Sequence, residues 1–183
     1  MDETTRKLFG DLRRTDYQVR YITFLNILAE TDKPVDWAYE VWDWLVAELK
    51  SEDNHQRAIA AQILGNLAKS DPQKRVLKDF DKLLAVTSDE RFVTARHSLQ
   101  AIWKVGAAGK EQRQMLVDAL SSRFQDCASE KHYTLIRYDI LQGFRNLYDA
   151  VGDESLKMKA QALIETEADP KYRQKYRRVW NGS

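Results

Sequence analysis

The chain has 183 residues, enough for one compact domain or a short array of repeats. Lysine and arginine number 29 against 28 aspartates and glutamates, so the net charge of +1 indicates no particular partner. With 43% hydrophobic and 31% charged residues but only seven glycines and three prolines, the composition excludes a disordered tail and disfavours a turn-rich β sandwich or barrel. No run of about 18 apolar residues could span a bilayer, and a single cysteine, Cys127, suits a reducing compartment. We expect a helical, cytoplasmic protein that does not contact a membrane.

Helical periodicity predicts ten helices of two alternating kinds. The first kind, termed A, covers residues 6–13, 37–49, 75–84, 115–124 and 156–164. The second kind, termed B, starts with a polar turn and an early arginine, and covers residues 16–28, 53–67, 92–103, 133–147 and 169–180. Pro34, Pro72 and Pro170 are each predicted at a helix entrance, where a missing amide donor costs least. No segment alternates apolar and polar residues for long enough to predict a strand.

The early arginines of the B helices define an internal repeat. Arg20, Arg57, Arg96, Arg137 and Arg173 are separated by 37, 39, 41 and 36 residues. A period near 40 is typical of stacked helical pairs. One residue before each arginine, and three and seven residues after it, the side chains are mostly apolar or small, which places them on one buried helix face. The pattern predicts five antiparallel helix pairs without a linker between them.

The second unit resembles a HEAT repeat, whose B helix carries a turn aspartate, Val-Arg, a small residue and then Leu-Gly-x-Leu. The matching residues are Asp53, Arg57, Ala60, Ala61, Leu64, Gly65 and Leu67. The first, fourth and fifth units match in part, and the third departs most because no aspartate stands four residues before Arg96. The resemblance implies an all-α, right-handed α–α superhelix of about five HEAT-like hairpins in one domain. Its units are expected near residues 4–31, 34–69, 72–106, 109–150 and 153–181.

The positive side chains of the B helices have two possible roles. The resemblance implies a structural ladder, in which an arginine braces the turn of a neighbouring unit. Alternatively, the cations form a basic face, joined by residues 171–178, which hold five cations and two tyrosines. The candidate binding residues are Arg20, Arg57, Arg96, Lys104, Arg137, Arg145, Arg173, Arg177 and Arg178.

Three functions are compatible with these residues. The leading hypothesis, implied by the resemblance, is a non-enzymatic scaffold that binds a protein partner through its B-helix surface. The second is nucleic-acid binding by a basic concave face and the basic C-terminal helix. The third is an enzyme similar to the HEAT-like DNA alkylation-repair glycosylases, with Asp139 beside Tyr138, and Arg137 and Arg145 nearby. Exposure of Asp139 in a basic concavity would favour the enzyme, and pairing of Asp139 with an arginine would disfavour it.

Two further groups of residues are candidates for a metal site and for an interface anchor. His55, His97 and His132 are not at metal-ligand spacing and Cys127 has no companion thiol, so we expect no metal and no cofactor. Trp37, Trp42 and Trp44 could include an exposed interface anchor, but core packing is the preferred interpretation.

Overall fold

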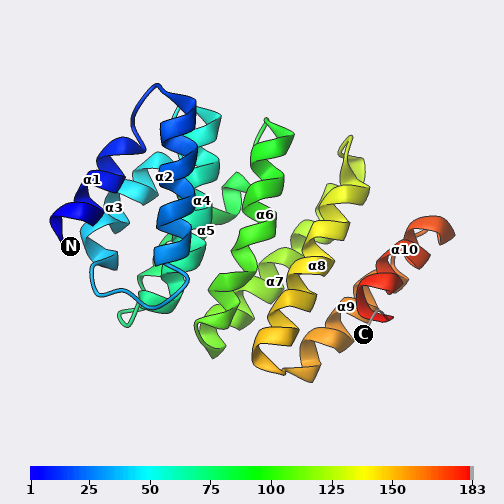
Figure 1. The fold of residues 1–183 in the computed structure, drawn as a ribbon. Helices are drawn as coiled ribbons and strands as arrows, with labels where there is room; N and C mark the ends of the chain where they lie inside the picture. Colours follow the sequence, from blue (N-terminus) through cyan, green and yellow to red (C-terminus); the bar gives the residue numbers. More distant parts are fainter. Residues whose placement is uncertain (182–183) are drawn as a thin grey trace.

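The computed structural model describes residues 1–181 and is all-helical, with no strand in that range (Figure 1). The A helices are α1 (Glu3–Asp11), α3 (Ala38–Glu48), α5 (Arg75–Val86), α7 (Lys110–Asp126) and α9 (Glu154–Glu165). The B helices are α2 (Tyr17–Glu30), α4 (Asn54–Leu67), α6 (Phe92–Ala107), α8 (Tyr133–Val151) and α10 (Pro170–Asn181). Single 3-10 turns cover Ala68–Ser70 and Cys127–Ser129. The predicted all-α solenoid is confirmed.

The helices stack in chain order from the N-terminal to the C-terminal end. Each B helix contacts the next, from α2 through α4, α6 and α8 to α10, and α3, α5, α7 and α9 contact one another in the same way. Figure 1 shows the B helices on the near side, with α2 in blue at one end and α10 in red at the other. The B helices therefore form one continuous face of the molecule.

Aspartate side chains fix where several B helices begin. Asp16 accepts hydrogen bonds from the backbone N–H groups of Gln18 and Val19, and Asp53 accepts one from His55. These bonds satisfy donors of the first helical turn that have no partner within the helix. The predicted role of both aspartates is confirmed.

The prolines follow the prediction only in part. Pro170 is the first residue of α10, as expected, but Pro34 and Pro72 lie in turns several residues before α3 and α5. At Pro72 the reason is local. The Asp71 side chain accepts hydrogen bonds from the N–H groups of Arg75 and Val76, which starts α5 three residues later.

The side chains expected on the inner helix faces form the core. Leu64, Ile140 and Phe144 are each at most 2% exposed. Small residues bring α4 and α6 especially close, because a methyl group on Gly65 would lie 3.1 Å from the carbonyl oxygen of Ala101. The middle of the B layer is therefore tightly closed, and its two ends are the places where helices stand further apart.

The tryptophan-rich helix α3 belongs to the core, as preferred from the sequence. Trp42 is fully buried, and its indole N–H donates a 3.0 Å hydrogen bond to Asp79. Trp37 is also buried and meets the ring of Phe9 edge-on at 5.6 Å. These two side chains are not available as surface anchors.

Within residues 1–181, no helix combines the length and the apolar character needed to cross a bilayer.

Candidate functional site

Four of the candidate arginines form a ladder that joins successive units. Each arginine lies on one B helix, and its acidic partner lies in the next unit. The ion pairs are Arg20–Asp53 at 2.7 Å, Arg57–Asp89 at 2.6 Å, Arg96–Asp139 at 2.7 Å and Arg137–Glu167 at 2.8 Å. The structural role considered for these arginines is thus present in the molecule.

The Arg57–Asp89 pair shows which interactions stabilise such an ion pair. Two hydrogen bonds of 2.6 and 2.9 Å connect the guanidinium to both carboxylate oxygens, and they raise the pKa of Arg57. Burial alone would raise the pKa of Asp89, but the bonds from Arg57 and from the N–H of Arg91 outweigh burial and lower that pKa. Both partners are therefore charged at neutral pH.

Asp139 is part of this ladder and is not a free acid. It is 3% exposed, and both of its oxygens accept hydrogen bonds from Arg96, at 2.7 and 3.0 Å. Gln100 makes a further contact of 3.4 Å with the same carboxylate. This pairing is the arrangement named above as disfavouring the enzyme hypothesis, and the third unit uses this carboxylate where the others use an acidic residue in a turn.

No metal centre can be built from the described residues, since no three His, Cys, Asp or Glu side chains among them are grouped to hold an ion. Cys127 is buried, and burial raises the pKa of its thiol. A buried thiol of raised pKa is a poor nucleophile.

The C-terminal candidates differ in their surroundings. Arg173 donates two hydrogen bonds, of 2.9 and 2.7 Å, to the carbonyl oxygen of Glu167 and so closes the turn before α10. Arg177 forms an exposed 2.7 Å ion pair with Glu165. Among the described residues Arg178 has no ion pair, and its side chain lines a groove between α8 and α10.

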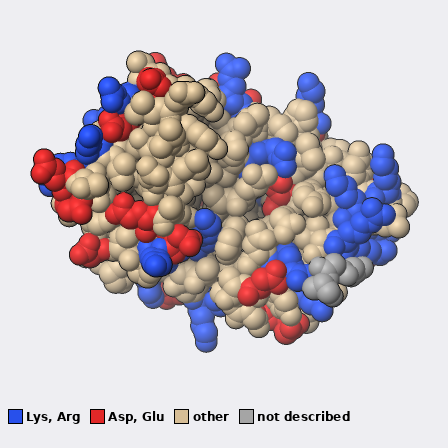
Figure 2. Space-filling view, in the orientation of Figure 1, with Lys and Arg blue, Asp and Glu red and all other residues tan. Residues whose placement is uncertain are grey.

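This basic groove has a volume of about 410 Å³. Its charged lining residues are Arg145, Asp149, Lys175 and Arg178. Arg145 pairs with Asp149 at 2.8 Å, and the ammonium of Lys175 lies 5.0 Å above the ring of Tyr138. Figure 2 shows lysines and arginines gathered over this end of the B face. The groove can attract an anion, because its lining contains three cations and one carboxylate and is therefore net positive.

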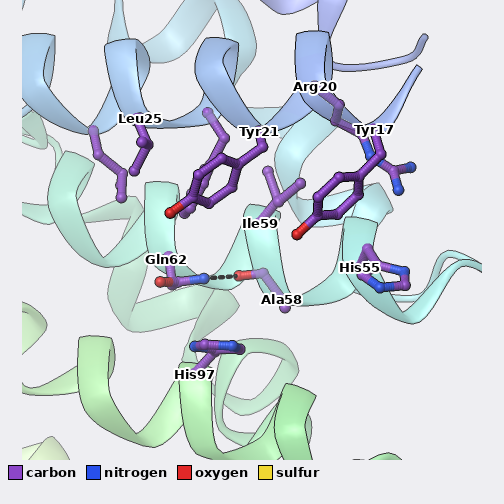
Figure 3. Close-up of a pocket in the computed structure, with 11 residues that line it drawn as sticks. Tyr17, Arg20, Tyr21, Leu25, His55, Ala58, Ile59, Gln62 and His97 are labelled. Atoms are coloured by element: carbon purple, nitrogen blue, oxygen red, sulfur yellow. Dashed lines mark hydrogen bonds between the residues drawn. The ribbon is translucent and has the colours of Figure 1, made fainter. Parts of the chain in front are cut away.

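A second groove lies at the opposite end, between α2 and α4, and has a volume of about 330 Å³ (Figure 3). Tyr17 and Tyr21 are 61% and 49% exposed, and their rings stack with centroids 6.1 Å apart. Leu25, 44% exposed, continues this row at the same spacing of four residues. Figure 3 shows both hydroxyl groups pointing from α2 toward α4, with His97 of α6 on the far side. We call this the tyrosine groove. Its rim presents aromatic rings for packing and hydroxyl groups for hydrogen bonds.

The tyrosine groove was not predicted from the sequence. Interface anchors were expected among Trp37, Trp42 and Trp44, and binding residues among the cations. A signal was present, because residues 17–28 carry apolar or aromatic side chains on more sides than one buried helix face requires. An end helix of this kind exposes part of that apolar surface.

Charge separates the two helix layers. The B helices contain eleven lysines and arginines and three acidic residues, whereas the A helices contain ten and twelve. Lys104 is the one candidate cation of the first three B helices without an ion pair among the described residues, and its ammonium bonds the side-chain oxygen of Asn66. Burial, together with Lys69, lowers the pKa of Lys104. The B layer is thus positive although the whole chain is nearly neutral.

No family model matches the chain, and no curated protein matches it. Among solved structures, the chain is similar to an engineered protein with a TM-score of 0.61 and 15% identity, over 97% of this chain and 78% of the other. A designed armadillo repeat protein in complex with the peptide (KR)4 aligns with a TM-score of 0.49 and 13% identity, over 98% of this chain and 99% of the other. The likeness to the engineered protein concerns the fold alone. Together with the ladder, it places this chain among the helical repeat solenoids.

Proposed function

We propose that this protein is a non-enzymatic, HEAT-like scaffold that binds a protein partner through its B-helix surface. The observation that carries the proposal is the exposed row of Tyr17, Tyr21 and Leu25 beside the groove of α4. These side chains face the groove and solvent and are not part of the core, so a bound partner would cover the apolar surface that they expose.

The residue types also suit a protein interface. Tyrosine is enriched among residues that dominate binding energy, because its ring buries a large area while its hydroxyl finds a hydrogen-bond partner. Ile22, 59% exposed, extends the same helix surface. A contiguous apolar surface of this kind on a helix of a soluble protein marks an interaction site.

The proposal includes no catalytic step and no cofactor. The acidic side chains of α8 that could act in catalysis, Asp139 and Asp149, are bonded to Arg96 and Arg145. A cytoplasmic location is part of the proposal and is supported by the single, buried Cys127.

Site-specific photo-crosslinking tests the protein-binding surface. A benzophenone amino acid replaces Tyr17 on α2 or, as a control, Met158 on α9; these positions are 61% and 64% exposed. In nuclease-treated lysate of the native host we expect a discrete protein adduct from position 17 only. The captured protein, identified by mass spectrometry and purified, should bind the parent chain. Equal adducts from both positions, or none from position 17, would contradict the proposal.

A second candidate function, nucleic-acid binding, is favoured by the basic groove. Lys171, Lys175 and Arg178 have no ion pair among the described residues, so their charge is free to meet phosphates. The informative variant changes these three to Gln and keeps Arg173, which closes a turn. A matched control changes Arg6, Lys7 and Lys78 of the A layer to Gln, removing the same charge.

Salt dependence decides this second candidate. If the groove contacts phosphates, the log–log slope of duplex DNA affinity against salt should fall by about 0.9 per lost contact in the groove variant and stay unchanged in the control. Equal slopes in both variants would show that the groove is not a phosphate-binding site and that any binding reflects general attraction by positive charge.

A further inference from the structure

The tyrosine groove has the length and shape of a short recognition site. From Tyr17 to Leu28 its α2 wall spans twelve residues, about 16 Å for eleven steps of 1.5 Å. Ile59 and Ala58 form the opposing wall on α4, and Gln62 lies one turn further along. A groove of three helical turns between two helices accommodates side chains that recur every three or four residues.

An extended peptide is a poor occupant of this face. Its backbone needs hydrogen-bond partners along its whole length, and an all-helical wall has no strand edge to supply them. Side-chain amides could replace such an edge, but Gln62, the amide that lines the groove, is already engaged, as are several others of the B helices. Gln62 donates to the carbonyl of Ala58, Asn66 to that of Leu28, Gln100 to Asp139 and Gln142 to Asn146. A helix, whose backbone is satisfied internally, requires no such partners.

A second copy of the chain is also disfavoured, because the apolar area is too small. The four exposed side chains of the row and its extension, Tyr17, Tyr21, Ile22 and Leu25, are between 44% and 61% exposed. At roughly 100 Å² each they offer about 400 Å², half of the roughly 800 Å² per partner in a stable interface. A single helix matches this area better than a whole protomer does.

The charges around the groove specify the chemistry of that helix. None of the eleven residues that line the groove is acidic, and Asp53, a carboxylate at its Tyr17 end, is bonded to two of them, Arg20 and His55. At its Leu28 end, Asn66 donates a 3.2 Å bond to the Leu28 carbonyl, and the same amide accepts a bond from the ammonium of Lys104. Lys104 has no ion pair among the described residues; burial and Lys69 lower its pKa, and the charge of Asp32 offsets this only in part. A carboxylate brought to this position would supply a direct counter-charge.

From these observations we infer that the tyrosine groove binds an acidic amphipathic helix of the partner. Apolar residues spaced by three or four positions insert between Tyr17, Tyr21 and Ile59. A glutamate or aspartate at one end of the helix pairs with Lys104. The net positive charge of the B helices, most of which lies in α10, attracts an acidic segment at long range before contact. This inference rests on the proposed scaffold function and specifies the class of its ligand.

A display library of helical peptides tests the inference directly. Sixteen-residue, alanine-based peptides are randomised on one face and at both flanks and selected against the full chain. Enriched peptides are synthesised, and their affinities are measured by fluorescence anisotropy. We expect a net negative charge and at least two large apolar residues at spacing three or four. Enrichment of basic or proline-rich peptides, or no enrichment, would overturn the inference.

Variants then locate the binding. Tyr21→Ala should weaken the selected peptides at least about tenfold, as expected for an interface anchor. Lys104→Glu should weaken them several-fold, and exchanging the peptide's terminal glutamate for lysine should restore affinity to that variant. Met158→Ala, which changes a similarly exposed side chain on α9, should alter affinity less than twofold. Full affinity in the Tyr21 variant, or no rescue by the charge exchange, would contradict the assigned groove.

Light scattering tests whether a second copy of the chain occupies the groove instead of a helix. If the parent chain forms a dimer and Tyr21→Glu dissociates it, the occupant is a second copy and the inference is wrong.

Different results would contradict the inference and the proposed function. A partner that still crosslinks at position 17 but docks without an acidic helix contradicts only the inference, whereas the absence of any protein adduct at position 17 contradicts the function itself.

Discussion

The two ends of the B layer have the same architecture and opposite surfaces. At the N-terminal end, α2 and α4 enclose a groove of about 330 Å³ with tyrosines on its rim and no acidic lining residue. At the C-terminal end, α8 and α10 enclose about 410 Å³ lined by three cations and one carboxylate. Figure 2 shows the contrast on one face, with a mostly uncharged surface over the upper part of α2 and a dense positive cluster over α10.

The difference follows from what the first and last B helices bury. Helix α10 buries Tyr176 and Trp180 and turns most of its cations to solvent. Helix α2 buries Phe24 and Ile27 but leaves Tyr17 and Tyr21 exposed. The N-terminal groove is therefore the better place to look for a protein partner, and the C-terminal groove the better place to look for an anion.

Alanine at one tyrosine of each end helix gives the largest expected contrast. Tyr176 of α10 is fully buried, contacts the ring of Phe124 and donates a 3.1 Å hydrogen bond to the Thr134 carbonyl. Tyr176→Ala should lower the free energy of unfolding by about 3–5 kcal/mol, whereas Tyr21→Ala should change it by less than about 0.5 kcal/mol. Urea denaturation measures both. Similar losses in the two variants would show that Tyr21 also belongs to the core.

Two ion pairs of the ladder should also contribute unequally to stability, with the larger contribution again at the C-terminal end. The side chains of Arg137 and Glu167 are 10% and 2% exposed, whereas those of Arg20 and Asp53 are 14% and 38% exposed. Arg137→Met leaves a buried carboxylate without its counter-charge and should cost about 3 kcal/mol. This is the lower end for a broken buried pair, because Glu167 keeps a 3.1 Å bond from the Asp169 N–H.

The matched change Arg20→Met should cost at most about 1 kcal/mol, because water can solvate Asp53. Denaturation curves of both variants check this order. If Arg20→Met were the more damaging change, the N-terminal unit would depend on its rung more than burial indicates.

The spacing of the arginines was sufficient to predict the architecture. Arg20, Arg57, Arg96, Arg137 and Arg173 mark one position in each unit, and B helices start within a few residues of the predicted bounds. The capping roles of Asp16 and Asp53 followed from their distance to these arginines. Both inferences concern contacts within one helix or its first turn, where sequence separation determines spatial separation.

The partners of the ladder could not be predicted in this way. Arg96 meets Asp139, which lies inside a helix, and Arg137 meets Glu167, which no aspartate pattern indicates. Such pairs depend on how one unit is rotated against the next. The tyrosine groove depends on the same rotation, because Tyr21 faces solvent only where α2 stands away from α4.

Alkaline pH provides the last and smallest contrast, and it concerns Tyr176 of α10. Burial raises the pKa of Tyr176 well above the ordinary value of 10.0 for a tyrosine. The unfolded chain therefore releases this proton first, and above pH 10 the native state binds more protons than the unfolded state. Stability contributed by Tyr176 is fully present below pH 10 and decreases by about 1.4 kcal/mol per pH unit above it.

The variant Tyr176→Phe removes this titration together with one hydrogen bond. At pH 8 it should be less stable than the parent by about 1 kcal/mol, because the bond to the Thr134 carbonyl is lost. By pH 11 the parent loses about 1.4 kcal/mol that the variant retains, so the difference should close and slightly reverse. Urea denaturation at intervals between pH 8 and 11 measures the difference. A constant difference across this range would mean that Tyr176 ionises in the folded protein as readily as in the unfolded chain, and that α10 seals its end of the solenoid less completely than its burial indicates.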